Sequence, residues 1–123
     1  MLLIQRQTGD VPVRPSRDAG IDVAAALAAW VSDVEPAALF CCSRGEAQVA
    51  AARQIAIYLA HVALGHDLSR LASAFGRDRA TLRHALRRVE DRRDDPGFDA
   101  SLSRMEAILM PLRGGRTVRE AGR

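Results

Sequence analysis

The chain has 123 residues, of which 48% are hydrophobic, and it carries a formal net charge of +3. This length suffices for one domain with a single hydrophobic core. Alanine is abundant and the aromatic residues are limited to three Phe, one Tyr and one Trp, a composition that favours close-packed helices and argues against a β-sandwich.

The N-terminal half begins with residues 1–18, which mix Gly, Pro, Arg and Asp without a period and are expected to form a flexible arm. Periodic apolar residues predict a helix over residues 21–34, and Pro36 predicts a short helix from residue 35 or 36 to residue 41. After a break at residues 43–45, the longest pattern predicts a central, mostly buried helix over residues 46–64. Gly65 suits the left-handed position that ends such a helix.

The C-terminal half is expected to add three helices. The first covers residues 68–75, N-capped by Asp67 or His66. An arginine-rich helix follows over residues 79–93, and after a break at residues 94–97 a last helix covers residues 98–109. Residues 111–123 are expected to form a flexible tail. The prediction is therefore an all-α domain of five to six helices over residues 19–110. Its core is expected to contain Ala52, Ile55, Ala56, Leu59, Leu71, Phe75, Leu82 and Leu86.

The two helices around Gly76 have the pattern of a helix-turn-helix. An apolar-periodic segment ends at Phe75, Gly76 provides the turn, and a second helix follows at once with polar residues at its start. In this motif the second helix lies in the DNA major groove and its N-terminal residues reach base edges. The residues expected at that tip are Arg77, Asp78, Arg79, Ala80, Thr81 and Arg83.

The basic residues are concentrated in the same part of the chain. Residues 44–93 contain ten Arg against five acids, whereas residues 1–43 contain three Arg against five acids. Such an excess is typical of a nucleic-acid footprint, although a solvated basic face without a partner is the alternative. All 18 basic residues are arginine, a bias that codon usage also explains, and each is a planar fork suited to phosphate and guanine.

Three quoted segments give the sequence a family resemblance. Arg53-Gln-Ile-Ala-Ile-Tyr-Leu-Ala60, then Ala74-Phe-Gly-Arg-Asp-Arg-Ala-Thr-Leu-Arg-His-Ala85 and Val89-Glu90, resemble the C-terminal box-binding domain of the bacterial replication initiator DnaA. That domain has patterns close to A-R-Q-I/M-A-M-x-L and F-G-G-R-D-H-S/T-T-V-x-H-A. The resemblance covers roughly residues 21–110 and implies a Trp-repressor-like helix-turn-helix fold. It also implies duplex DNA binding through the recognition helix and a basic loop that reaches the minor groove.

The resemblance does not extend to the ATPase module of the initiator. That module needs a G-x-x-x-x-G-K-S/T phosphate loop, and this chain contains no lysine. The sequence therefore indicates a free-standing relative of the DNA-binding domain, which cannot itself melt an origin through ATP.

The resemblance assigns roles at individual positions. Arg53 matches a phosphate-contacting arginine of the central helix, Asp78 and Thr81 match signature residues, and His84 matches the histidine before the alanine. The sequence departs from the family at the turn, where only Gly76 remains of two glycines. It departs again at the tip, where Arg79 replaces the base-contacting histidine and Ala80 replaces the first threonine. In the basic loop, the place of the minor-groove arginine falls on Gly45 or Arg44, depending on the direction of counting.

Several of these residues keep two interpretations. Arg79 could place its fork on guanine or touch a phosphate, and Asp78 could accept from cytosine or N-cap the helix. Arg77, Arg83 and Arg87 lie where phosphates would flank the helix. A second group of arginines is expected to face solvent or to pair with Glu90 and Asp94; its members are Arg88, Arg92 and Arg93.

The remaining polar and aromatic residues do not predict an enzyme or a cofactor site. His61 and His66 lie five positions apart and lack an acidic partner for a metal site, so a solvated or packed pair is expected. Cys41 and Cys42 are adjacent, which strains a disulfide, and are expected to stay reduced with a structural role. Tyr58 and Trp30 lie in apolar stripes and are expected to face the core or a partner.

The sequence also contains no pattern typical of secretion or of a membrane span. The apolar run at residues 1–4 is too short for a signal, and the apolar stretch at residues 23–31 is interrupted by acids on both sides. A cytoplasmic, nucleoid-associated protein is expected, without a membrane or small-molecule partner.

Two functions remain open on the sequence. The first is a DNA-binding protein that regulates replication initiation or transcription, with weak or altered preference for the initiator's box. The second is an adaptor that docks on the replication initiator or on one of its regulators.

Overall fold

The computed structural model describes residues 19–41 and 46–113, and within these ranges every regular element is helical. The elements are α2 (Ala19–Ser32), the 3₁₀ helix η1 (Pro36–Phe40), α3 (Ala47–Val62), α4 (Leu68–Phe75), α5 (Arg79–Arg92), α6 (Pro96–Leu109) and the 3₁₀ turn η2 (Met110–Leu112). The all-α prediction is confirmed. The expected arm, Cys42, Arg44, Gly45 and residues 114–123 of the expected tail lie outside the described residues.

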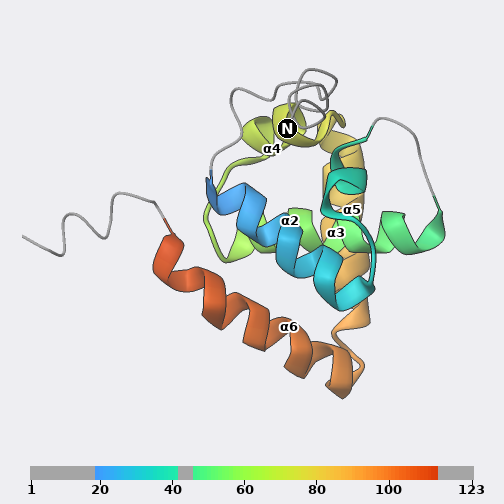
Figure 1. Ribbon diagram of the computed structural model, residues 1–123, viewed down its shortest axis with the longest axis vertical. Coiled ribbons are helices and arrows are strands. Elements are labelled where there is room, and N and C mark those ends of the chain that lie inside the picture. The colour runs from blue at the N-terminus through green and yellow to red at the C-terminus, as the bar shows by residue number, and fades with distance from the viewer. Residues whose placement is uncertain (1–18, 42–45, 114–123) are drawn as a thin grey trace, which may run out of the picture.

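Helix α3 forms the centre of the molecule (Figure 1). It contacts α2, η1, α4, α5 and α6. A helix can be surrounded in this way only if apolar residues cover most of its circumference, and its buried residues come from consecutive positions. The buried part of α3 comprises Ala52, Arg53, Ile55, Ala56, Ile57, Tyr58, Leu59 and Ala60.

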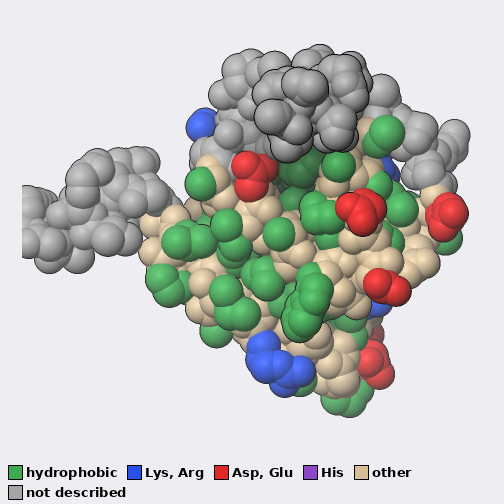
Figure 2. Space-filling model, viewed as in Figure 1, with side chains coloured by type: hydrophobic (Ala, Val, Ile, Leu, Met, Phe, Trp, Pro, Cys, Tyr) green, Lys and Arg blue, Asp and Glu red, His purple; other side chains and the backbone are tan. Residues whose placement is uncertain are grey.

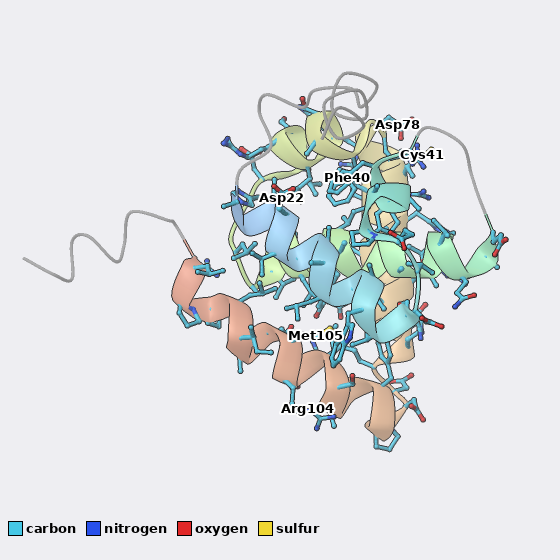
Figure 3. The ribbon with its side chains drawn as sticks, viewed as in Figure 1. Asp22, Phe40, Cys41, Asp78, Arg104 and Met105 are labelled. Atoms are coloured by element: carbon cyan, nitrogen blue, oxygen red, sulfur yellow. The ribbon has the colours of Figure 1, made fainter. Side chains whose placement is uncertain are left out.

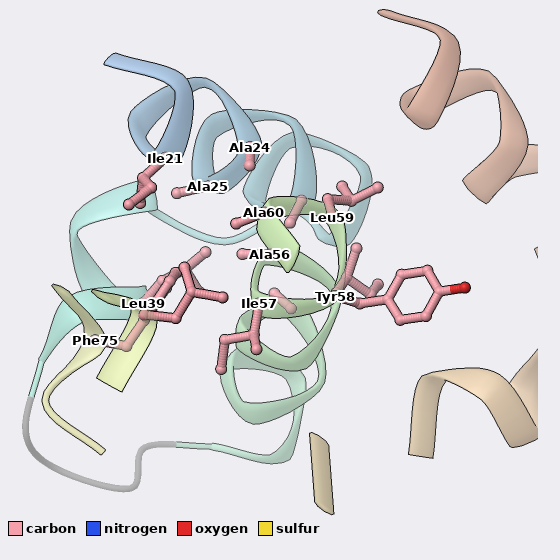
Figure 4. Close-up of a cluster of buried hydrophobic side chains, with 14 of the residues drawn as sticks. Ile21, Ala24, Ala25, Leu39, Ala56, Ile57, Tyr58, Leu59, Ala60 and Phe75 are labelled. Carbon is pink, nitrogen blue, oxygen red and sulfur yellow. The ribbon is translucent and has the colours of Figure 1, made fainter. Parts of the chain in front are cut away.

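Alanines allow α2 and α3 to approach each other closely. Four alanines of α2 and three of α3 are at most 1% exposed, and Figure 4 shows Ala25 of α2 beside Ala56 and Ala60 of α3. Helices pack at distances set by the side chains at their contact, so methyl groups permit a short separation. These seven alanines therefore serve the close contact between α2 and α3.

A second part of the core joins η1 to α4. The Phe40 and Phe75 rings stack with centroids 4.8 Å apart and planes 18° apart, and Leu39 is fully buried. Stacked aromatic pairs of this kind stabilise a contact beyond the area that they bury. The stack fixes the end of η1 against the helix that precedes the turn.

The predicted core is largely confirmed. Seven of the eight residues are buried, and Leu86 is partly buried against the same cluster. The sequence prediction did not include the contribution of α2 and η1 to this core, which comes from Ile21, Ala24, Ala25, Ala28, Ala29, Leu39 and Phe40.

Several helix boundaries differ from the prediction; α3 covers Ala47–Val62 instead of residues 46–64, because Glu46 is its N-cap and Ala63 its C-cap. Helix α2 ends at Ser32, two residues early, because Asp33 is left-handed with φ 60° and the Val34 amide bonds to the carbonyl of Ala29. The segment after Pro36 is a 3₁₀ helix rather than an α-helix. Helix α4 has the predicted bounds, and Asp67 is its N-cap.

Helix α6 begins two residues before the predicted position. Asp95 is its N-cap, accepting a hydrogen bond from the Phe98 amide at 2.8 Å, and Pro96 occupies the first turn. The prediction interpreted these residues as a break, whereas Asp followed by Pro is typical of a helix start. Helical structure continues through η2, and Arg113 donates to the carbonyl of Val62 at 3.2 Å, so ordered structure extends beyond residue 110.

Candidate nucleic-acid interface

The turn between α4 and α5 is defined by two short-range features. Gly76 ends α4 in the left-handed conformation with φ 66°, and no atom would lie within 4 Å of a Cβ added there. Glycine is therefore required by the backbone angle and not by lack of space. Asp78 then N-caps α5, because its carboxylate accepts a hydrogen bond from the Thr81 amide at 2.8 Å.

The cap also affects the acidity of Asp78. The hydrogen bond from the Thr81 amide lowers the pKa of this carboxyl below its usual value, as do a second bond from Thr81 and the nearby charge of Arg83. The capping interpretation of Asp78 is thus confirmed. A negative charge at this position also complements the positive end of the helix dipole.

The part of α5 that follows the cap has one buried side and one exposed side. Leu82, Ala85 and Val89 are buried against the core. The exposed residues toward the N-terminal end form what we call the outer face of α5; they are Arg79, Ala80, Thr81, Arg83, His84 and Arg87. Arg83 and Arg87 are four residues apart and therefore lie on the same side of the helix, one turn apart.

Two arginines near the turn are held by groups of other elements. Arg77 is half-buried and donates to the carbonyl of Cys41 at 3.3 Å, which connects the turn to the residue that follows η1. Figure 3 shows Cys41 and Asp78 at the same end of the molecule. Arg79 donates through Nη2 to Ser69 Oγ in α4 at 2.6 Å.

Arg53 is placed differently from the expectation. Arg53 is only 6% exposed. Its Nε donates to the carbonyl of Leu39 at 2.8 Å, and its Nη2 donates to the carbonyl of Ala38 at 3.2 Å. Burial, with a further contribution from the charge of Arg77, lowers the pKa of Arg53. The resemblance to the DnaA domain assigned a phosphate contact to Arg53. In the structure, its guanidinium instead donates hydrogen bonds to two carbonyls of η1. Arg53 therefore has a structural role in this fold, and its contact with a phosphate stays a prediction.

We expect Arg53→Ala to lower the free energy of unfolding by about 1–3 kcal/mol, because truncation leaves the buried carbonyl of Leu39 without this donor, whereas the carbonyl of Ala38 keeps the Cys41 amide. Urea denaturation measures this loss. At a temperature where the variant is folded, its affinity for duplex DNA should remain within about threefold of wild type, a change below roughly 0.7 kcal/mol. A large loss of DNA affinity in a fully folded variant would instead support the phosphate contact.

Arg93 also differs from the prediction, which expected it to face solvent or to pair with Glu90 and Asp94. Its guanidinium donates to Asp99 at 2.5 Å, to Glu106 at 2.9 Å and to Tyr58 Oη at 2.9 Å. Burial lowers the pKa of Arg93, but the bonds to Glu106, Asp99 and Tyr58 outweigh this effect and raise it. Arg93, the residue that follows α5, therefore joins α5 to α6 and α3 and is not part of the outer face of α5.

The other residues considered in the sequence do not add to this surface. His61 Nδ1 lies 2.9 Å from the carbonyl oxygen of His66, so the two histidines are in contact. Within residues 19–41 and 46–113, no three side chains of His, Cys, Asp or Glu cluster so that they could hold a metal ion. In the same ranges, no helix is long and apolar enough to cross a membrane.

The face in Figure 2 differs from the outer face of α5. In this view hydrophobic side chains predominate over α2 and α6, and few basic side chains are visible. Trp30 of α2 is 79% exposed, which answers the question left open by the sequence, because this ring is not part of the core. Tyr58, in contrast, is buried.

The comparison with known families agrees with this geometry. The family model described as "Bacterial dnaA protein helix-turn-helix" matches residues 31–89, from the end of α2 through most of α5. The match therefore includes the turn, the Asp78 cap and the outer face of α5. No curated protein matches the chain.

Proposed function

Because the chain carries a helix-turn-helix of the bacterial DnaA type over residues 31–89, we propose that it binds duplex DNA and thereby regulates replication initiation or transcription. The observation that carries the proposal is the outer face of α5, which presents three arginines beside a capped helix N-terminus. In this binding mode α5 enters the major groove and α4 crosses the DNA backbone. No ATP-dependent step is part of the proposed activity.

The outer face of α5 has the chemistry that each part of a DNA contact requires. Arg83 and Arg87 are exposed and one helical turn apart, so they can contact successive phosphates along one strand. Ala80 is small and exposed, which allows the helix to approach the base edges closely. Arg79, at the first position of α5, is placed where side chains of a recognition helix read bases.

A salt series tests this proposal. We expect the chain to bind fluorescently labelled duplex DNA at low salt, with log K falling linearly as log salt concentration rises. If three to four arginines contact phosphates, the slope should be about −3 to −4 because each contact releases counterions. Fluorescence anisotropy with random-sequence duplexes measures both the affinity and the slope.

Two results would contradict DNA binding. One is the absence of binding at micromolar protein in low salt, and the other is binding whose affinity does not depend on salt. A duplex containing the initiator's box and a scrambled duplex of the same composition form the matched pair for specificity. Strong preference for the unmodified box would contradict our expectation that Arg79 and Ala80 weaken or alter it.

A second function is favoured by one observation, the exposed indole of Trp30. A large aromatic side chain on the surface is typical of an interface with another protein. An adaptor that docks on the replication initiator through α2 would use this residue and would not need the arginines of α5. Calorimetric titration of the purified initiator, with wild type and Trp30→Ala in the absence of DNA, separates this function from DNA binding.

A further inference from the structure

The first arginine of α5 is held by a side chain of α4. Nη2 of Arg79 donates to Oγ of Ser69 at 2.6 Å, and both residues are exposed. Ser69 is the second residue of α4, so the bond spans the turn of the helix-turn-helix. The guanidinium of Arg79 is therefore fixed relative to both helices.

The other arginines of the outer face differ in this respect. Among the described residues, neither Arg83 nor Arg87 has a hydrogen bond to a side chain of another helix. A long side chain without such a partner loses substantial rotamer entropy when it is ordered on a ligand. Arg79 has already lost part of this freedom in the structure, and it is thereby preorganised.

The chemistry of the Ser69 hydroxyl leaves Arg79 able to bind a further acceptor. The neutral hydroxyl of Ser69 accepts an N–H of Arg79 and, unlike a carboxylate, does not cancel the positive charge of the guanidinium. A guanidinium has five N–H donors, and the serine O–H is itself a donor. Ser69 and Arg79 together therefore present donors at the start of α5, where N7 and O6 of guanine are the matching acceptors in the major groove.

We propose that Ser69 is a positioning residue that holds Arg79 for reading a guanine, so that the pair sets base preference. This inference rests on the proposed DNA binding. It differs from a phosphate contact by Arg79, because a phosphate offers the same charge at every base pair and gains little from a fixed side chain. It also differs from a latch in which the bond to Ser69 must break before Arg79 can reach DNA.

The test compares five variants with wild type by selection from random duplexes and by salt-dependent anisotropy. Ser69→Ala should lower the preference for guanine at one position by about 3- to 10-fold, the effect of one hydrogen bond. The salt slope should not change, because the charge of Arg79 remains. Ser69→Thr retains the hydroxyl and should keep the preference. Arg79→Ala should remove the preference with little change in the slope, because the slope reports phosphate contacts; a slope shallower by about one would instead indicate a phosphate contact by Arg79.

Ser73→Ala is the matched control, since Ser73 is also exposed on α4 one turn after Ser69. It should change neither preference nor slope, and thermal melting should show that all variants are folded. In the double variant Ser69→Ala/Arg79→Ala, the serine change should have no further effect.

Three results would overturn the inference. They are a wild type that binds duplex without a guanine preference, a Ser69→Ala variant with unchanged preference, and a Ser69→Ala variant with increased preference, as a latch requires. Each of these leaves DNA binding itself intact. Failure of the proposed function is seen separately, as absence of duplex binding by wild type.

Discussion

Replacing Arg83 and Arg87 together with glutamate is expected to weaken duplex binding at low salt by at least about 100-fold. Both side chains are exposed on the outer face of α5, one turn apart. Each charge-assisted hydrogen bond to a phosphate is worth roughly 1.5–3 kcal/mol, so the loss of two amounts to about 3 kcal/mol or more. The salt slope should also become shallower by about two. Anisotropy titrations over a salt series measure both quantities.

Arg104→Glu is the matched control for each single reversal, because it changes the net charge by the same amount. Arg104 is exposed on α6, and Figure 3 places it far from Asp78 at the start of α5. If general attraction between a basic protein and DNA were responsible, Arg104→Glu would weaken binding as much as Arg87→Glu. Equal losses would therefore contradict the assignment of the surface to α5.

The second large effect is expected in stability. Leu59→Ala should lower the free energy of unfolding by about 2–5 kcal/mol, because truncation leaves a cavity in a close-packed core. Leu59 is fully buried in α3, which contacts α2, α4, α5 and α6. Urea denaturation followed by circular dichroism measures this loss.

Leu112→Ala provides the same chemical change at a residue that is 40% exposed in η2. Leu112→Ala should lower the free energy of unfolding by clearly less than Leu59→Ala, because the Leu112 side chain is already partly in water. A loss below about 1 kcal/mol for Leu59→Ala would be inconsistent with burial of this residue, given the usual cost of large-to-small changes. The central position of α3 would then be wrong.

The helix-turn-helix was predictable from the sequence because its signals are local. Asp67 and Asp78 each cap a helix by accepting a hydrogen bond from an amide three residues on, and Gly76 adopts the left-handed angle at the turn. These features depend on residues within one helical turn, and the apolar period of 3.6 adds the buried face. For this reason the bounds of α4 and the start of α5 agree with the prediction.

The boundaries that failed had weaker local signals. Asp33 ends α2 with a positive φ, and the sequence has no glycine there that would have indicated a left-handed residue. The Asp95–Pro96 pair was interpreted as a break although it begins α6. In the first case a non-glycine residue adopts the left-handed region, which is uncommon. In the second case, Asp and Pro are typical both of turns and of helix starts, and only their order, Asp before Pro, distinguishes a helix start from a turn.

By itself, the sequence determined the all-α class, the helix-turn-helix and the concentration of arginine around it, because these follow from periodicity, caps and charge along the chain. Only the tertiary structure decided which arginines are available. Arg53 donates to a carbonyl 14 positions earlier, Arg93 to a carboxylate 13 positions later, and Arg79 to a hydroxyl 10 positions earlier. A guanidinium can bind a phosphate, a carbonyl or a carboxylate equally well by its chemistry. Its role therefore depends on which acceptor the packing of other helices brings within about 3 Å, and local sequence does not contain that distance.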